Sequence, residues 1–135
     1  MIRTYIDAGV LIAAARGEDD VAERALAVLE DSNREFLSSD FLRLEVLPKA
    51  IYGNRQAEAE FYEAFFETVV GWANDFAGIV EDAIGGASKI GLSAMDALHV
   101  ASAKSVHADE LVTTERTVKP IHRAERIRVV SIHPS

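Results

Sequence analysis

The chain contains no cysteine, so it can form neither a disulfide nor a thiolate metal site. It also lacks any apolar run of the roughly 18 residues that a membrane-spanning helix needs. The first residues pass directly into a strand pattern without the layout of a signal peptide. From these absences we expect a cytoplasmic protein that has no membrane partner.

Several phosphate-handling and nucleophile motifs are missing as well. The 8 glycines form neither the loop of nucleotide hydrolases nor a G-x-G-x-x-G fingerprint. The sequence Asp7-Ala-Gly lacks the second aspartate of a phosphatase D-x-D pair. The pair Ser38-Ser39 lacks the glycine framing of a nucleophile elbow. Any phosphate chemistry must therefore come from other groups.

What the chain does have is acid. Its 22 Asp and Glu residues against 14 Lys and Arg give a net charge of -8. Phosphate binding depends largely on Lys and Arg, so this charge argues against a general nucleic-acid coat protein. It leaves a nuclease open, because several of the acids can form a cluster that a divalent cation partly neutralises.

The length of 135 residues fits one domain over residues 1–135, and 49% hydrophobic content can supply its core. Strand patterns alternate with helical ones, which predicts an α/β fold: a three-layer α/β/α sandwich around a short, mostly parallel sheet. We expect strands at 2–6, 35–39, 68–72, 111–114 and 127–132, and helices at 8–16, 19–31, 40–51, 55–66, 75–90 and 93–107.

The helix expected at 93–107 is the centre of the chain. Its apolar and small residues recur at three- and four-residue spacing, as on a helix that packs closely against a sheet. Ser93 is a natural N-cap, and Asp96 lies in the first turn, where it can complete a capping box. Asp96 can equally be a functional acid, since Glu115 follows the next strand and ligands of open α/β sheets bind at that edge.

Two further acids have similar double interpretations. Asp7 ends the first strand and can cap the helix that follows it, or serve in a site. Glu45 is flanked by Leu44 and Val46, so it either faces solvent or is held inward by a partner, because an unpaired buried carboxylate is costly.

If the first and fourth strands are neighbours, Asp7, Glu45, Asp96 and Glu115 converge on one edge. Carboxylates about 5 Å apart repel by roughly 3 kcal/mol per pair at an effective dielectric near 20, so such a cluster favours a cation. Oxygen-only ligation suits Mg²⁺ or Mn²⁺. We expect Asp7, Asp96 and Glu115 as metal ligands and Glu45 as a ligand or the acid that orients the attacking water. Thr113 and Thr114 are expected to bind a ligand acid or the phosphate.

The same segments resemble a known family. The run Asp96-Ala-Leu-His-Val-Ala-Ser-Ala with Ala-Asp-Glu-Leu-Val-Thr-Thr-Glu115 is similar to the C-terminal half of PIN-domain ribonucleases, in particular the VapC-like toxins. Tyr-Ile-Asp7-Ala-Gly-Val-Leu-Ile-Ala resembles the family's first strand, and Leu37-Ser-Ser-Asp-Phe-Leu-Arg-Leu-Glu45 its second acidic motif. The resemblance implies a Mg²⁺- or Mn²⁺-dependent endoribonuclease, often one half of a toxin–antitoxin pair. A small antitoxin that inserts an Arg or Lys among the acids is then an expected partner.

Two departures from that family pattern keep an alternative open. Ala8 stands where the family usually has a hydroxyl or amide residue, and the fourth acid is Glu115 instead of Asp. These features favour a PIN-like module that binds RNA or protein and has weakened catalysis. A receiver-like domain phosphorylated on aspartate fits less well, because the second acid after the first strand is missing.

The remaining expectations concern surfaces. Basic residues gather between 104 and 128, where they form either a phosphate-facing patch or a solvated surface; Arg116 and Lys119 are expected to bind the RNA substrate. The aromatic stripe of helix 55–66 is interpreted as core or subunit interface, and a homodimer through it is a hypothesis. The four histidines show no paired ligand spacing, and His99 is expected to be a packed or surface imidazole.

Overall fold

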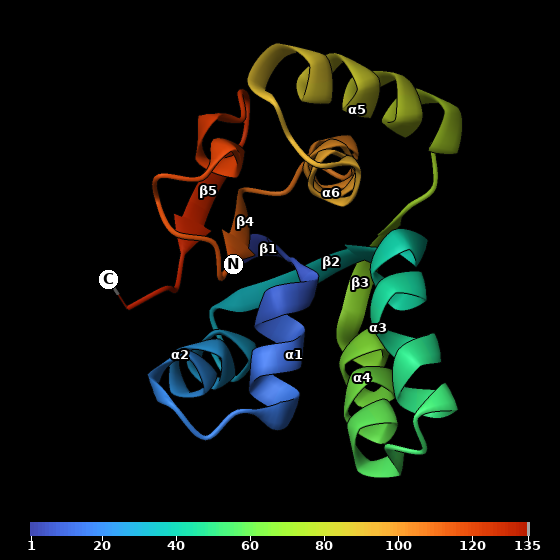
Figure 1. The fold of residues 1–135 in the computed structure, drawn as a ribbon, viewed down its shortest axis with the longest axis vertical. Helices are drawn as coiled ribbons and strands as arrows, with labels where there is room; N and C mark the ends of the chain where they lie inside the picture. Colours follow the sequence, from blue (N-terminus) through green and yellow to red (C-terminus); the bar gives the residue numbers. More distant parts are fainter. Residues whose placement is uncertain (135) are drawn as a thin grey trace.

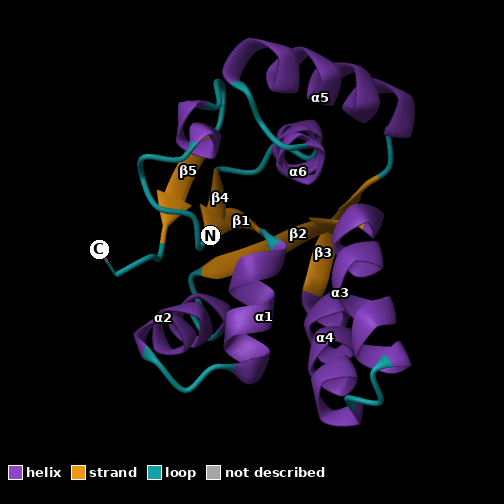
Figure 2. Cartoon of the chain, viewed as in Figure 1, coloured by secondary structure: helices purple, strands orange, loops and turns teal. Residues whose placement is uncertain are grey.

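The computed structural model describes residues 1–134, and Figures 1 and 2 show their arrangement. In chain order the elements are β1 (Ile2–Ile6), α1 (Ala8–Arg16), α2 (Asp20–Leu29), β2 (Arg34–Ser39), α3 (Asp40–Tyr52), α4 (Gln56–Thr68), β3 (Val69–Ala73), α5 (Phe76–Ile90), α6 (Ala94–Ser105), β4 (Glu110–Thr113), the 3-10 helix η1 (Pro120–Arg123) and β5 (Arg128–Ser131). Within this part of the chain, no helix combines the length and the apolar character needed to cross a membrane.

The five strands form one sheet in the order β3-β2-β1-β4-β5, and every neighbouring pair is parallel. Parallel strands require crossover connections, which the helices supply. The chain moves outward from β1 to β2 and β3, and then returns to place β4 on the other side of β1. The strand order therefore reverses between β1 and β4, and this is the position where open α/β sheets bind ligands.

Helices cover both faces of the sheet, which confirms the predicted three-layer α/β/α fold (Figure 1). Successive strand residues point to opposite faces: Tyr5 belongs to the core beneath α5 and α6, and Ile6 to the core beneath α1, α2, α3 and α4. Leu111 and Val112 of β4 divide in the same way. Both cores converge on β1, which fixes the position of the residue that follows it.

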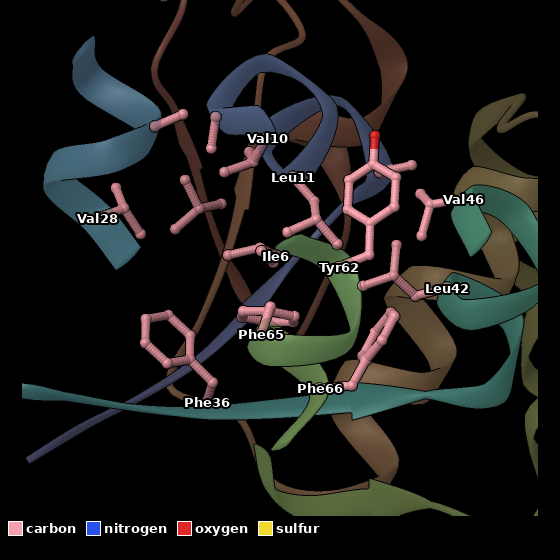
Figure 3. Close-up of a cluster of buried hydrophobic side chains, with 14 of the residues drawn as sticks. Ile6, Val10, Leu11, Val28, Phe36, Leu42, Val46, Tyr62, Phe65 and Phe66 are labelled. Carbon is pink, nitrogen blue, oxygen red and sulfur yellow. The ribbon is translucent and has the colours of Figure 1, made fainter. Parts of the chain in front are cut away.

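The aromatic side chains of α4 belong to the second of these cores. Tyr62, Phe65 and Phe66 are buried against α1, α3 and β2, and Figure 3 shows Tyr62 between Leu11 and Val46 and Phe66 beside Leu42. The interpretation of the stripe as core is thus confirmed. Phe61 of the same stripe is only partly buried, and a homodimer through this helix stays a prediction.

Local details differ from the expected boundaries by one or two residues, and one cap is different. Helix α3 is capped by Ser39, whose Oγ accepts a hydrogen bond from the amide of Leu42 at 3.3 Å, instead of by the predicted Asp40. Serine and aspartate are about equally favourable at the N-cap, so the sequence alone could not decide whether Ser39 or Asp40 caps α3. Asp40 lies in the first turn and pairs with Arg43.

Candidate active site

The candidate site lies at the carboxyl ends of β1 and β4, which are hydrogen-bonded neighbours in the sheet. Asp7 directly follows β1, and Glu115 follows β4 by two residues. Asp96 lies in the first turn of α6, and Glu45 lies in α3. The adjacency of β1 and β4, on which the sequence argument depended, is therefore present.

Asp7 is held rigidly at this edge. Its Oδ1 atom accepts a hydrogen bond from the amide of Val10 at 3.2 Å and so caps α1, while Oδ2 accepts the hydroxyl proton of Thr113. Only 6% of the residue is exposed. The capping and site interpretations of Asp7 are thus compatible, because each uses a different oxygen.

Burial makes this carboxyl hard to ionise. It raises the pKa of Asp7 from 3.8 to about 6, against the hydrogen bonds from Thr113 and Val10 and the nearby His99, which lower it, and the charge of Asp96 raises it further. An acid whose charge is disfavoured in this way gains from any cation that binds beside it.

Asp96 is the second acid whose pKa is raised. Burial is the main cause, and the charges of Glu115 and Glu45 add to it. Its amide donates to Ser93 Oγ at 3.2 Å, so the predicted N-cap is confirmed. Asp96 thus lies between the other acids electrostatically: its charge raises the pKa of Asp7, while the charges of Glu115 and Glu45 raise its own.

Glu45 is held inward by a partner, one of the two arrangements expected for it. Its Oε1 atom lies 2.7 Å from His99 Nε2. This hydrogen bond is the main reason why the pKa of Glu45 falls below its ordinary value. His99 is 2% exposed, so the packed interpretation of this imidazole is confirmed.

Sequence reasoning missed the residues behind His99. The hydroxyl of Tyr5 lies 2.7 Å from His99 Nδ1 and 2.7 Å from Ser39 Oγ, and all three residues are buried. Tyr5 comes from β1, Ser39 from the end of β2 and His99 from α6. A tyrosine two residues before Asp7 was the available signal, but alternation alone marks it as an ordinary core residue.

The buried acids elsewhere in the molecule are neutralised differently. Glu110 lies 2.9 Å from Arg34 Nε and accepts the hydroxyl of Thr4, and Glu58 is bound by Arg16 with Arg55 nearby. Asp7 is the third buried carboxylate, and it has no Lys or Arg partner within residues 1–134. The same holds for Asp96 and Glu115 in that part of the chain.

The acidic side chains of the site lie farther apart than the ligands of a metal centre do. Across residues 1–134, no group of three or more His, Asp or Glu side chains is gathered closely enough to hold a metal ion. The four acids interact electrostatically, but as arranged here they do not form a ligand cage. Asp96 and Glu115 are only half-buried, so their side chains have space to turn.

The threonines after β4 have separate positions. Thr113 is fully buried; its hydroxyl donates to Asp7 and accepts from the amide of Glu115 at 3.1 Å, so it binds an acid of the site. Thr114 is half-buried and lies against Gly9, where an added Cβ would come within 2.2 Å of Thr114 Oγ1. The absence of a side chain at Gly9 thus allows α1 to lie close to the segment that follows β4.

The basic segment is only partly free. Lys104 Nζ lies 2.9 Å from Asp82, and Arg126 lies 3.9 Å from the same residue. Arg116 and Lys119 are exposed and form no ion pair with the described residues. Arg116 directly follows Glu115 in sequence, and Lys119 lies four residues after it.

An α/β domain with unpaired acids at the switch point of a parallel sheet defines the class of this protein. Residues 4–123 match the PIN domain family, and the chain belongs to it. PIN domains are generally nucleases. No curated protein matches the sequence.

Three solved structures show the same fold. VapBC2 from Rickettsia felis, bound to a promoter DNA fragment, has a TM-score of 0.72 at 12% identity, with 96% of this chain and 98% of that chain covered. A toxin–antitoxin complex from Klebsiella pneumoniae has a TM-score of 0.65 at 18% identity, covering 96% and 98%. FitAcB from Neisseria gonorrhoeae has the same score and identity, covering 98% and 99%.

Proposed function

We propose that this chain is a divalent-metal-dependent endoribonuclease that hydrolyses RNA phosphodiester bonds. One observation carries the proposal: within residues 1–134, Asp7 is buried without a Lys or Arg partner, while the other buried carboxylates, Glu58 and Glu110, are each bound by arginine. A buried, unneutralised carboxylate is costly unless something positive binds to it. Membership of the nuclease family supports the same conclusion.

The donor set suits a hard cation. Asp7, Asp96 and Glu115 offer carboxylate oxygens only, which is the chemistry of Mg²⁺ and Mn²⁺ sites. Because the acids are not gathered as they stand, binding requires Asp96 and Glu115 to turn toward Asp7. Asp7, Asp96 and Glu115 would hold the metal, which would supply Lewis-acid polarisation of the phosphodiester and activation of a water.

The protein's own groups then have distinct tasks. Thr113 and the α1 amide of Val10 fix the orientation of Asp7. Glu45, kept ionised by its hydrogen bond from His99, accepts a hydrogen bond from the attacking water and orients it. Thr114, Arg116 and Lys119 bind the phosphate backbone of the RNA beside the acids.

The direct test is cleavage of RNA by the purified chain with Mg²⁺ or Mn²⁺ and with EDTA. We expect cleavage only with metal, and a loss of at least 100-fold in the Asp96→Asn variant, by analogy with removal of a catalytic electrostatic group. Asp82→Asn is the matched control, since Asp82 already has Lys104 and should not affect cleavage. Metal-independent cleavage, or an active Asp96→Asn variant, would refute the proposal.

We further propose a small antitoxin as partner, since the structural neighbours include a toxin–antitoxin complex from Klebsiella pneumoniae. Its expected inhibitory device is an Arg or Lys inserted among the acids, which supplies the positive charge that Asp7 lacks. Co-expression with the neighbouring reading frame should yield a stable complex with suppressed RNA cleavage. Recovery of the chain alone from such co-expression would count against a pair.

A second candidate is a PIN-like module that binds RNA or protein with weakened catalysis. The open arrangement of the acids favours it. In that case RNA binds without being cut, and uptake of Mn²⁺ does not depend on Asp7 or Asp96. The cleavage assay and a metal titration separate the two candidates.

A further inference from the structure

A chain of buried hydrogen bonds connects the start of α3 to Glu45 in the same helix by way of β1 and α6. It runs from the amide of Leu42 to Ser39 Oγ at 3.3 Å, and from there to Tyr5 Oη at 2.7 Å. Tyr5 Oη lies 2.7 Å from His99 Nδ1. The other ring nitrogen of His99, Nε2, lies 2.7 Å from Glu45 Oε1.

The donors and acceptors along this chain can be assigned from its end. An ionised carboxylate only accepts, so Nε2 of His99 must carry a proton toward Glu45. In the neutral ring Nδ1 then accepts from Tyr5, whose oxygen accepts from Ser39, which in turn accepts from Leu42. The Tyr5 hydroxyl has one proton, and it donates this proton to Nδ1. In this series of hydrogen bonds, each group from Leu42 to His99 therefore donates to the next one, and Glu45 accepts the last bond.

Burial differs between the two ends of this series of hydrogen bonds: the Tyr5 and Ser39 end is enclosed in the core, and the Glu45 end reaches solvent. Tyr5 and Ser39 are fully buried and the His99 side chain is 2% exposed, whereas the Glu45 side chain is 28% exposed. A carboxylate with that exposure has no need of a buried imidazole to satisfy it, because water could do so. His99 also lies one helical turn after Asp96 on α6, so its bond to Glu45 sets the spacing between acids on two different helices.

We propose that His99 is a positioning residue of the nuclease site. Its Nε2–H group fixes the Glu45 carboxylate relative to Asp96, and Tyr5 and Ser39 fix the ring. This inference rests on the proposed ribonuclease function, in which Glu45 orients the attacking water. Reacting groups misplaced by about 1 Å can cost about 100-fold in rate.

Two amide variants at one position test the role, because each keeps one half of the imidazole. The amide nitrogen of Gln in His99→Gln occupies the place of Nε2 and can still donate to Glu45. The shorter Asn in His99→Asn reaches only toward Tyr5. We expect His99→Asn to lower kcat for RNA cleavage by 10- to 100-fold with KM within about twofold. We expect His99→Gln to regain most of that loss.

A double-mutant cycle shows whether His99 acts through Glu45. In a Glu45→Ala background, adding His99→Asn should lower kcat by no more than twofold, since the group to be positioned is gone. His107→Asn is the control for surface histidines, and it should leave kcat unchanged. Circular dichroism confirms that each variant is folded.

The ring itself provides a measurement that needs no activity. A long-range ¹H–¹⁵N correlation spectrum at fixed pH should show a protonated Nε2 at His99 in the wild-type chain. An unprotonated Nε2 overturns the proposal. Equal kcat for the Gln and Asn variants, or a full further loss in the Glu45→Ala background, overturns the positioning role while leaving the ribonuclease intact. A wild-type chain that cuts no RNA with Mg²⁺ or Mn²⁺ overturns the ribonuclease, and the positioning role with it.

Discussion

Three carboxylate side chains are buried in the part of the chain that the structure describes, and their surroundings distinguish structural acids from a candidate functional one. Glu110 and Glu58 are each compensated by an arginine, as a stable fold requires. Asp7 is compensated only by neutral donors and carries a pKa raised to about 6 by burial. Residues that keep such an unfavourable charge are candidates for function, because selection for stability alone would remove it.

This difference predicts opposite effects of the same chemical change. In Asp7→Asn, the amide still caps α1, since Asn caps as well as Asp, and the buried charge is lost. We expect the free energy of unfolding in EDTA at pH 8 to rise by about 1–2 kcal/mol while cleavage is lost. Urea unfolding measures the first effect and the RNA assay the second.

The gain should depend on pH in a defined direction. Asp7 has a higher pKa in the folded state than its ordinary 3.8, so its ionisation lowers wild-type stability as pH rises from about 4 to about 6. The advantage of Asp7→Asn is therefore complete above pH 7 and shrinks toward zero at pH 4. A constant advantage across this range would show that the charge of Asp7 is not its cause.

Glu110→Gln is the matched comparison at the opposite end of the sheet. It removes the charge that Arg34 and the hydroxyl of Thr4 bind. We expect a loss of roughly 1–3 kcal/mol in the free energy of unfolding, because a buried guanidinium loses its partner. Cleavage per folded molecule should be unchanged. A stabilising Glu110→Gln variant would contradict the distinction drawn between the two kinds of acid.

Among the candidate site residues, those at ends of elements could be predicted and those joined by long-range contacts could not. Asp7, Asp96 and Glu115 stand where a strand ends or a helix begins, and this position is visible in the pattern of neighbours. The link between Tyr5 and His99 depends on two segments 94 residues apart meeting in the core. No local pattern in the sequence specifies the contact between Tyr5 and His99. A tyrosine that only fills the core and one that orients a histidine therefore look alike in the sequence.

At the scale of elements, α6 depends on small residues. Ala97, Ala101 and Ala103 are buried between the sheet, α5 and η1, and they let the helix that carries Asp96 approach closely. Helix α5 ends at Gly91 with φ of 74°, a left-handed conformation that glycine adopts without strain, and the chain turns there into α6. The position of Asp96 thus depends on how closely the buried alanines of the same helix pack against their neighbours.

Replacing Ala103 with Leu tests this dependence. Ala103 is fully buried in the core beneath α5 and α6, so three additional carbon atoms must displace α6, and we expect a loss of about 1–3 kcal/mol in the free energy of unfolding. Cleavage should fall as well, since Asp96 moves with the helix. Chemical denaturation and the RNA assay on the folded variant provide the two values; an unaltered variant would show that α6 tolerates displacement.

The sequence of elements was largely predictable because strands and helices alternate with clear breaks. Each expected strand and helix is present, and their ends differ by one or two residues in most cases. The strand order was not predictable from periodicity, since nothing local states that β4 lies beside β1. That single adjacency depends on the complementarity of both cores, and it creates the site.

For the molecule as a whole, the net charge of -8 and the unpaired acids should link folding to divalent ions. A cation that binds only the folded chain stabilises it, by about 2.7 kcal/mol when its concentration is 100 times Kd. We expect Mn²⁺ to raise Tm by roughly 5–10 °C, and Asp96→Asn to remove most of this increase. An equal rise in both chains would point to nonspecific binding on the acidic surface.

The most direct measurement is an isothermal titration of Mn²⁺ into the wild-type chain and into the Asp7→Asn, Asp96→Asn and Asp82→Asn variants. We expect saturable binding in the wild-type chain that is retained in Asp82→Asn and lost in the other two. A wild-type chain that takes up no Mn²⁺, or an Asp96→Asn chain that binds it as tightly, would contradict the assignment of these acids to a metal-dependent site.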